Sequence, residues 1–171
     1  CMVASKARLA KPEDMATAVG LMAECAGSPG MVGGQVLDIM SQERELSEQE
    51  VLDIQSRKTG ALINAACALG AIAGGASDEQ FNAACQFAAG LGLAFQIEDD
   101  ILDIEGDAAT LGKSIGKDAA SEKSTFPSLL GLEECRELAA KLTEEAVDAV
   151  KPLDGHAFLV ELARSLTGRT K

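Results

Sequence analysis

The sequence predicts an all-α protein, and three observations support this fold class. Hydrophobic residues recur with helical spacing along most of the chain, and no stretch alternates as a β-strand would. Nearly half of the 171 residues are apolar, yet the aromatic residues are limited to five Phe. A core made mainly of Ala, Leu, Ile, Val and Met favours close-packed helices over a β-sandwich or barrel. The length suits one domain.

Helix start and stop signals agree with this periodicity. Pro12 begins the first predicted helix, because proline is favoured in a first helical turn and acidic residues follow it. Ser47 with Glu50, and Ser77 with Gln80, form capping-box patterns that begin two longer helices. Helices are therefore expected at residues 12–27, 35–40, 47–74, 77–106, 128–150 and 156–166.

The helix predicted at residues 77–106 should lie in the middle of the protein. Between Phe87 and Ile97 only Gln96 is strongly polar, and a helix that is apolar on all sides is typical of a core position. Residues 106–127 mix Gly, Lys, Asp, Ser and Thr, and they are predicted to form a long ordered loop after this helix.

An acidic motif occupies the last part of that helix, and its aspartates are Asp99, Asp100 and Asp103. Residues three and four apart share a helix face, so these side chains and Gln96 should line one side. Repulsion between like charges there calls for a cation, and oxygen ligands without nearby His or Cys favour Mg²⁺. A solvated acidic patch is the alternative, which the apolar residues leading into the motif disfavour.

The segment after the motif supplies the complementary charge. Lys113, Lys117 and Lys123 lie among Gly, Ser and Thr residues, and ammonium groups with backbone amides of such loops commonly bind phosphate. Residues 106–114 also resemble a Walker A nucleotide-binding loop. Its glycines are one residue too far apart, and a helix precedes it where a strand is required, so nucleotide binding is not predicted.

Two further patterns lie upstream. Lys58, Thr59 and Gly60 fall inside a predicted long helix, where glycine costs roughly 1 kcal/mol relative to alanine. Gly60 therefore indicates either close helix packing or a kink that turns the Thr59 carbonyl outward. Taken alone, Lys58 is more typical of a solvated surface. Gln35 and Asp38 place an amide and a carboxylate on one helix face, which is a weak signal by itself.

The composition argues against several partners. The 27 acidic and 15 basic residues give a net charge of −12, which disfavours binding to nucleic acids or anionic lipid surfaces. The five cysteines match neither a disulfide framework nor a zinc motif, so a reducing cytoplasm is expected. The sequence shows no secretion signal and no apolar stretch that predicts a membrane span.

Together these motifs resemble a known family. In chain order they are Gly34-Gln35-x-x-Asp38, Lys58-Thr59-Gly60, Phe95-Gln96-x-x-Asp99-Asp100-x-x-Asp103, Gly112-Lys113, Gly116-x-Asp118 and Lys123-Ser124-Thr125. In this order and at these separations they look like the later conserved blocks of trans-isoprenyl diphosphate synthases, in particular bacterial farnesyl diphosphate synthases. The resemblance covers essentially the whole chain from Gly30 onward.

The resemblance implies a prenyltransferase reaction. An allylic diphosphate, dimethylallyl or geranyl, ionises, and the double bond of isopentenyl diphosphate attacks the carbocation to give farnesyl diphosphate for isoprenoid biosynthesis. The implied residues are Asp99, Asp100 and Asp103 for Mg²⁺, Lys58, Lys113 and Lys123 for the diphosphate, and Lys58, Thr59 and Gln96 for catalysis. Geranylgeranyl diphosphate is the alternative product. Residues 107–113 and the block at Lys123 favour farnesyl because they look bacterial and short-chain.

The family's first aspartate-rich motif has no counterpart in this sequence. Residues 1–171 are therefore expected to be the C-terminal part of a single polyprenyl synthase domain, an orthogonal or antiparallel helical bundle of the isoprenoid synthase type. We expect the chain alone to have little or no condensation activity. The resemblance also implies a homodimer.

Two other functions stay open. A non-catalytic helical subunit that works by association would explain the absent first motif, but it would not need the intact metal and phosphate residues. A class I terpene cyclase, or an unrelated helical phosphohydrolase, would use similar aspartates. The blocks at Lys58 and Lys113 disfavour that last reading.

Overall fold

The computed structural model describes residues 11–42, 44–111 and 124–167. Its elements are α1 (Pro12–Ala26), α2 (Met31–Met40), α3 (Glu48–Gln55), the π-helix η2 (Ser56–Gly60), α4 (Ala61–Gly74), α5 (Asp78–Leu111), α6 (Phe126–Leu130), α7 (Leu132–Val150) and α8 (Ala157–Thr167). No strand occurs within these three ranges, and the predicted all-α class is confirmed.

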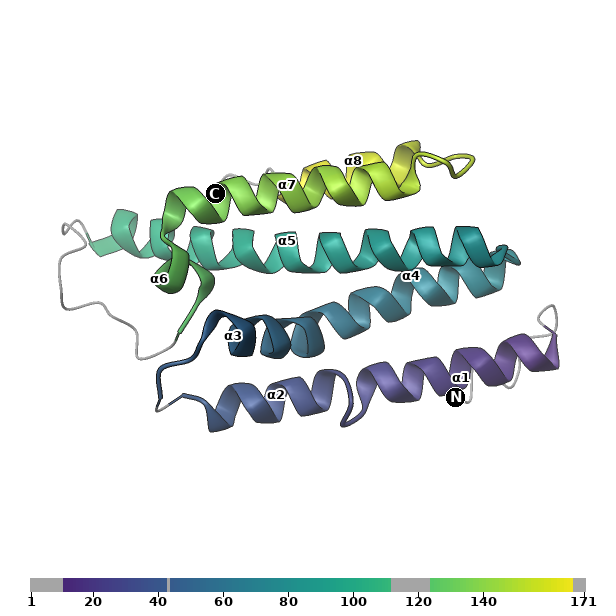
Figure 1. Ribbon diagram of the computed structural model, residues 1–171, viewed down its shortest axis with the longest axis horizontal. Coiled ribbons are helices and arrows are strands. Elements are labelled where there is room, and N and C mark those ends of the chain that lie inside the picture. Colours follow the sequence, from purple (N-terminus) through teal and green to yellow (C-terminus); the bar gives the residue numbers. More distant parts are fainter. Residues whose placement is uncertain (1–10, 43, 112–123, 168–171) are drawn as a thin grey trace.

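The helices lie in stacked layers with α5 in the middle (Figure 1). Helices α1 and α2 follow each other along one edge, α3, η2 and α4 form the next layer, and α7 with α8 lies beyond α5. Helix α5 packs against α4 and η2 on one side and against α7 on the other. The central position predicted for residues 77–106 is therefore confirmed.

Two hydrophobic clusters fix α5 between its neighbours. One joins α5 to α7 and α8 and contains Phe87, Leu91, Ala146, Val147, Val150 and Ala163. The other brackets the acidic motif and includes Val51, Ile54, Ile97, Ile101, Phe126 and Cys135. Because Ile97 and Ile101 are almost fully buried, the turns that carry the aspartates cannot rotate relative to the core.

The predicted helix at residues 47–74 forms, but a π-helical turn interrupts it. Its start is the expected capping box: the Ser47 hydroxyl accepts from the Glu50 backbone N–H, and the Glu50 carboxylate accepts from the Ser47 N–H. Gly60, the last residue of η2, faces Gly92 of α5, where an added Cβ would lie 3.3 Å from the Gly60 Cα. The close contact therefore requires glycine at position 92, whereas a Cβ at Gly60 would meet only the Gln55 carbonyl oxygen at an ordinary 3.8 Å. Close packing, one of the two reasons expected for Gly60, is not found at that residue.

The predicted end of the central helix was wrong. Helix α5 continues past Gly106 to Leu111, so the first part of the expected loop at residues 106–127 is helical. The glycine costs only about 1 kcal/mol, which is too little to end a helix of this length. Just before Gly106, the Glu105 carboxylate is paired with the Arg136 guanidinium of α7 at 2.5 Å.

Two other boundaries also differ from the prediction. The helix expected at residues 128–150 is divided into α6 and α7 by Gly131, whose φ of 90° is the left-handed conformation that glycine favours. Helix α2 begins at Met31, ahead of the expected Gln35, and includes Gly33 and Gly34. Gly33 packs on the preceding turn at Ser28, and Gly34 packs on η2. Among the described helices none is long and apolar enough to cross a membrane.

Candidate active site

Lys58 is held by helix α2. Its Nζ lies 2.6 Å from Oδ2 of Asp38, whose side chain is 6% exposed, whereas the Lys58 side chain is 32% exposed. Helix α2 comes this close because Gly34 has no side chain: an added Cβ would lie 2.3 Å from the Lys58 backbone nitrogen. Gly34 therefore sets the approach of the two helices, and Asp38, one turn later, binds the ammonium group.

Thr59, the next residue, is bonded to the opposite neighbour. Its hydroxyl donates to Oε1 of Gln96 at 3.0 Å, and Nε2 of Gln96 donates to Oδ1 of Asp100 at 3.1 Å. The π-turn thus links α2 and α5 through two consecutive side chains. Thr59 and Gln96, predicted from separate segments of the sequence, are in contact here, and Lys58 lies next to Thr59 but is bonded to α2.

The three aspartates follow Gln96 along α5. Asp99 and Asp100 are half-buried, and Asp103, one turn further, is exposed. Within the described part of the chain no three acidic, His or Cys side chains converge closely enough to enclose a metal ion. Mg²⁺ is typically bound by one or two carboxylates together with phosphate oxygens, so two carboxylates one helical turn apart, such as Asp99 and Asp103, fit a metal that arrives with a diphosphate.

The predicted lysines of the following segment cannot be located in the same way. Lys113 and Lys123, expected to bind the diphosphate, lie outside the described residues, and so does Lys117. Lys58 is therefore the one predicted diphosphate ligand with a described position.

Asp38 is the ion-pair partner of Lys58, a role that the sequence did not predict. It was paired there with Gln35, but Gln35 is exposed and Asp38 is buried against Lys58. The available signal was a lone carboxylate among Val36, Leu37 and Ile39 in a short helix. A buried carboxylate needs a cationic or hydrogen-bonding partner, and Lys58 supplies one.

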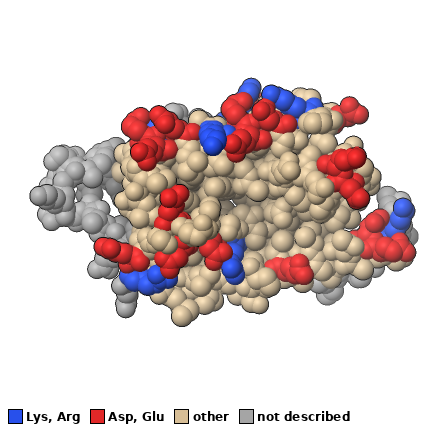
Figure 2. Space-filling view, viewed as in Figure 1, with Lys and Arg blue, Asp and Glu red and all other residues tan. Residues whose placement is uncertain are grey.

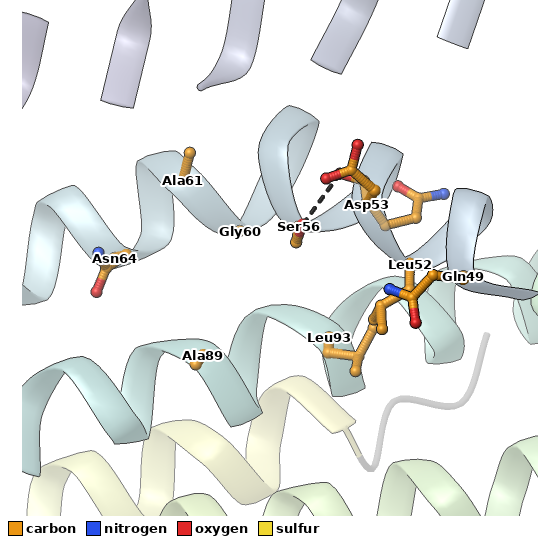
Figure 3. Close-up of a pocket in the computed structure, with 10 residues that line it drawn as sticks. Gln49, Leu52, Asp53, Ser56, Gly60, Ala61, Asn64, Ala89 and Leu93 are labelled. Carbon is orange, nitrogen blue, oxygen red and sulfur yellow. Dashed lines mark hydrogen bonds between the residues drawn. The ribbon is translucent and has the colours of Figure 1, made fainter. Parts of the chain in front are cut away.

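A cavity of about 480 Å³ lies beside this cluster, between the α3–η2–α4 layer and α5 (Figure 3). It is lined by Gln49, Leu52, Asp53, Gln55, Ser56, Gly60, Ala61, Asn64, Ala89 and Leu93. The Ser56 hydroxyl donates to the backbone carbonyl of Asp53 at 3.0 Å on its wall. No predicted site residue with a described side chain lines it, so the cavity is adjacent to the cluster and not part of it.

The overall charge of the protein does not attract an anionic substrate. Acidic side chains gather in several groups on the face shown in Figure 2, and the net charge is −12. A diphosphate therefore needs local cations.

Near Asp100, burial raises the pKa of the Cys135 thiol, and the charges of Asp100 and Glu134 raise it further. That thiol stays protonated at neutral pH and is a poor nucleophile.

Comparison with known proteins identifies the family. Residues 2–155 match the family model described as polyprenyl synthetase. The chain belongs to the polyprenyl synthetase family.

Curated relatives of this family member include both product classes. The "Heterodimeric geranylgeranyl pyrophosphate synthase large subunit 1, chloroplastic" of Arabidopsis thaliana is 40% identical over 171 residues, which is 97% of this chain and 46% of that protein. The farnesyl diphosphate synthase of Escherichia coli is 41% identical over 141 residues, or 82% of this chain and 47% of that protein. The chain thus spans about half the length of the curated relatives it matches.

Solved structures share the fold of this chain. The geranyltransferase of Helicobacter pylori complexed with magnesium and isoprenyl diphosphate superimposes with a TM-score of 0.74 at 29% identity. The alignment covers 98% of this chain and 55% of that one. The predicted isoprenoid synthase fold is confirmed, and a family member is known to bind magnesium together with an isoprenyl diphosphate.

Proposed function

We propose that this chain supplies the diphosphate-binding half of a Mg²⁺-dependent trans-prenyltransferase. The reaction joins isopentenyl diphosphate to dimethylallyl or geranyl diphosphate and gives farnesyl diphosphate. The observation that carries the proposal is the cluster built on η2, in which Lys58 is fixed by α2 and Thr59 is bonded to Gln96 of α5. Asp99 and Asp103 follow Gln96 on the next turns of the same helix.

Each part of this cluster has a chemical task in the proposed reaction. The allylic carbon–oxygen bond breaks readily only when cations stabilise the departing diphosphate. Asp99, Asp100 and Asp103 would hold Mg²⁺, which supplies two positive charges beside the leaving group. Lys58, with Lys113 and Lys123, would bind the diphosphate oxygens. The dipoles of Thr59 and Gln96 would face the carbocation.

Farnesyl diphosphate is our choice of product, and geranylgeranyl diphosphate is supported equally by the relatives. They include both kinds of synthase at about the same identity, 40% and 41%. The choice of farnesyl rests on the bacterial, short-chain character of residues 107–113 and of the block that begins at Lys123. Chromatography of the dephosphorylated products, which separates 15-carbon from 20-carbon alcohols, decides between them.

We also propose that the synthase acts in the cytoplasm as a homodimer. Helix α2 exposes an apolar stripe made of Val32, Val36, Ile39 and Met40, which are 47%, 48%, 56% and 75% exposed. Such a stripe on a soluble protein usually meets a partner. The Arabidopsis relative is named as one subunit of a heterodimeric synthase, which supports association between two synthase chains.

The test compares the 171-residue chain with a completed synthase, in which the chain is joined to the N-terminal half of the Escherichia coli relative that it does not match. We expect the completed synthase to release pyrophosphate from geranyl and isopentenyl diphosphates, and to stop when a chelator removes Mg²⁺. The chain alone should release little or none. Strong activity of the chain alone, or none in a well-folded completed synthase, would contradict the proposal; the second result would favour a non-catalytic subunit.

A further inference from the structure

We propose that Asp38 is a positioning residue for Lys58, an inference that rests on the proposed diphosphate site. The evidence is the ion pair between Lys58 Nζ and Asp38 Oδ2 at 2.6 Å. Asp38 acts through the lysine: it determines where the ammonium group stands before the diphosphate arrives.

Helix α2 holds Lys58 at both of its ends. At the backbone, Gly34 lets α2 approach until no Cβ would fit against the Lys58 nitrogen. At the tip of the side chain, Asp38 binds the ammonium. A lysine has a flexible four-carbon stem, and its freedom is lost when it binds a ligand. Because both ends of Lys58 are fixed before the ligand arrives, most of this conformational entropy is not lost in the binding step.

The anchored ammonium group can still bind a ligand. It carries three N–H donors, and Asp38 takes one of them from the shielded side, since its own side chain is 6% exposed. The Lys58 side chain is 32% exposed, so it has an open side. The remaining donors are available there for diphosphate oxygens, which accept charge-assisted hydrogen bonds.

Two effects of Asp38 oppose each other, and the choice of variant must separate them. Its carboxylate positions Lys58, but its negative charge also repels a diphosphate. Asp38→Asn would remove both effects at once. Asp38→Glu keeps the negative charge and moves the carboxylate by one methylene. It therefore changes the position of the Lys58 ammonium group with little change in the electrostatic repulsion of the diphosphate.

The main experiment measures the affinity for inorganic pyrophosphate in the presence of Mg²⁺ by titration calorimetry on the full 171-residue chain. We expect Asp38→Glu to weaken binding about tenfold or more, because a misplaced ammonium forfeits a charge-assisted hydrogen bond. The matched control is Asp53→Glu, the same change in the Asp53–Arg57 ion pair, whose side chains are 44% and 41% exposed. It should alter the affinity by less than about twofold.

A double-mutant cycle tests whether Asp38 acts through the lysine. In a Lys58→Met background, Asp38→Glu should change the affinity by less than about twofold, because no ammonium is left to position. An equal loss in both backgrounds would overturn the inference, since Asp38 would then have a general structural role. Wild-type affinity in Asp38→Glu would overturn it as well.

A second measurement covers the case in which Asp38→Glu fails to fold. The ¹⁵N signal of the Lys58 ammonium group is visible when its protons exchange slowly with water. It should be present in the wild type, lost in the isosteric Asp38→Asn, and retained in Asp53→Asn; an unchanged signal in Asp38→Asn would overturn the inference. Failure of the proposed function would look different, because the wild type would not bind pyrophosphate at all while this signal would still report on the ion pair.

Discussion

Single residues without side chains set the geometry around Lys58. Gly92 permits the contact between η2 and α5, and Gly34 permits the contact between η2 and α2. Gly60 itself is not needed for space, because a Cβ there would meet only the Gln55 carbonyl oxygen at 3.8 Å. The cost of a glycine inside a long helix made Gly60 conspicuous in the sequence. Gly34 was not conspicuous, because the atoms it would meet belong to a helix that is distant in the chain. That part of the site therefore needed the structure.

Gly34→Ala should destabilise the protein. The added Cβ would lie 2.3 Å from the Lys58 backbone nitrogen, and overpacking of this kind typically costs about 1–3 kcal/mol. Gly20→Ala is the matched control, because nothing lies within 4 Å of the Cβ there, and alanine should stabilise that helix by about 0.5–1 kcal/mol. Urea unfolding of both variants measures the difference, and equal stabilities would show that α2 does not pack on η2 as described.

The pairings of the site residues were only partly predictable. Residues on one helix face, such as Gln96 and Asp100, could be paired from their spacing, and the bond between them is found. The partner of Lys58 could not be, since Asp38 lies on another helix and helix spacing says nothing about contacts between helices. The same limit applies to Thr59, whose bond to Gln96 crosses from η2 to α5.

At the scale of the element, helix starts marked by a proline or a capping box were predicted well because those signals are local, whereas the start of α2 at Met31 was not predicted. The capping box at Ser47 is formed as expected, and it makes α3 begin at Glu48. The end of α5 was predicted wrongly because a single glycine is a weak stop signal, and the helix continues past Gly106 to Leu111. The π-turn at Ser56–Gly60 was also missed, because it depends on how tightly α2 and α5 pack against it.

The capping box gives the start of α3 a pH dependence. Hydrogen bonds from the Ser47 backbone N–H, followed by Arg44 and the Ser47 hydroxyl, lower the pKa of Glu50 from 4.5 to about 2. A carboxyl group whose pKa is lowered on folding stabilises the folded state fully at pH values above its pKa in the unfolded chain. That stabilisation is lost as the pH falls from about 4.5 toward 2.

Glu50→Gln should therefore be less stable than the wild type at pH 7, with a difference that shrinks below pH 4.5 and disappears near pH 2. Chemical unfolding at several pH values measures this difference. Glu48→Gln, in the same helical turn but outside the capping box, should show a smaller difference. A Glu50→Gln difference that stays constant down to pH 2 would contradict the role of the charged carboxylate.

At the scale of the whole molecule, the sequence predicted the class and the central helix but not the surfaces. An all-apolar helix must lie inside a bundle, and α5 does so. The apolar stripe of α2 was not anticipated, because hydrophobic residues in a helix ordinarily predict burial within the chain. Ile39 and Met40 remain 56% and 75% exposed.

If a second copy covers that stripe, one charge should break the dimer. Ile39→Glu places a carboxylate in the proposed interface, and the mass of the completed synthase in solution should fall from dimer to monomer. Phe158→Glu is the control, because Phe158 is 69% exposed on α8, away from α2. Light scattering with size-exclusion chromatography gives the mass, and a dimer that survives Ile39→Glu would contradict the proposed interface.

The most direct test of the catalytic proposal is the turnover of the completed synthase carrying Asp99→Ala. Losing this carboxylate should lower turnover by orders of magnitude, since Mg²⁺ and the diphosphate would lose a ligand. It should leave the melting temperature nearly unchanged, because the residue lies among other acids that repel it. Glu137→Ala, an exposed acid on α7, should turn over normally. Undiminished turnover of the Asp99→Ala protein would contradict the assignment of this face of α5 as the metal and diphosphate site.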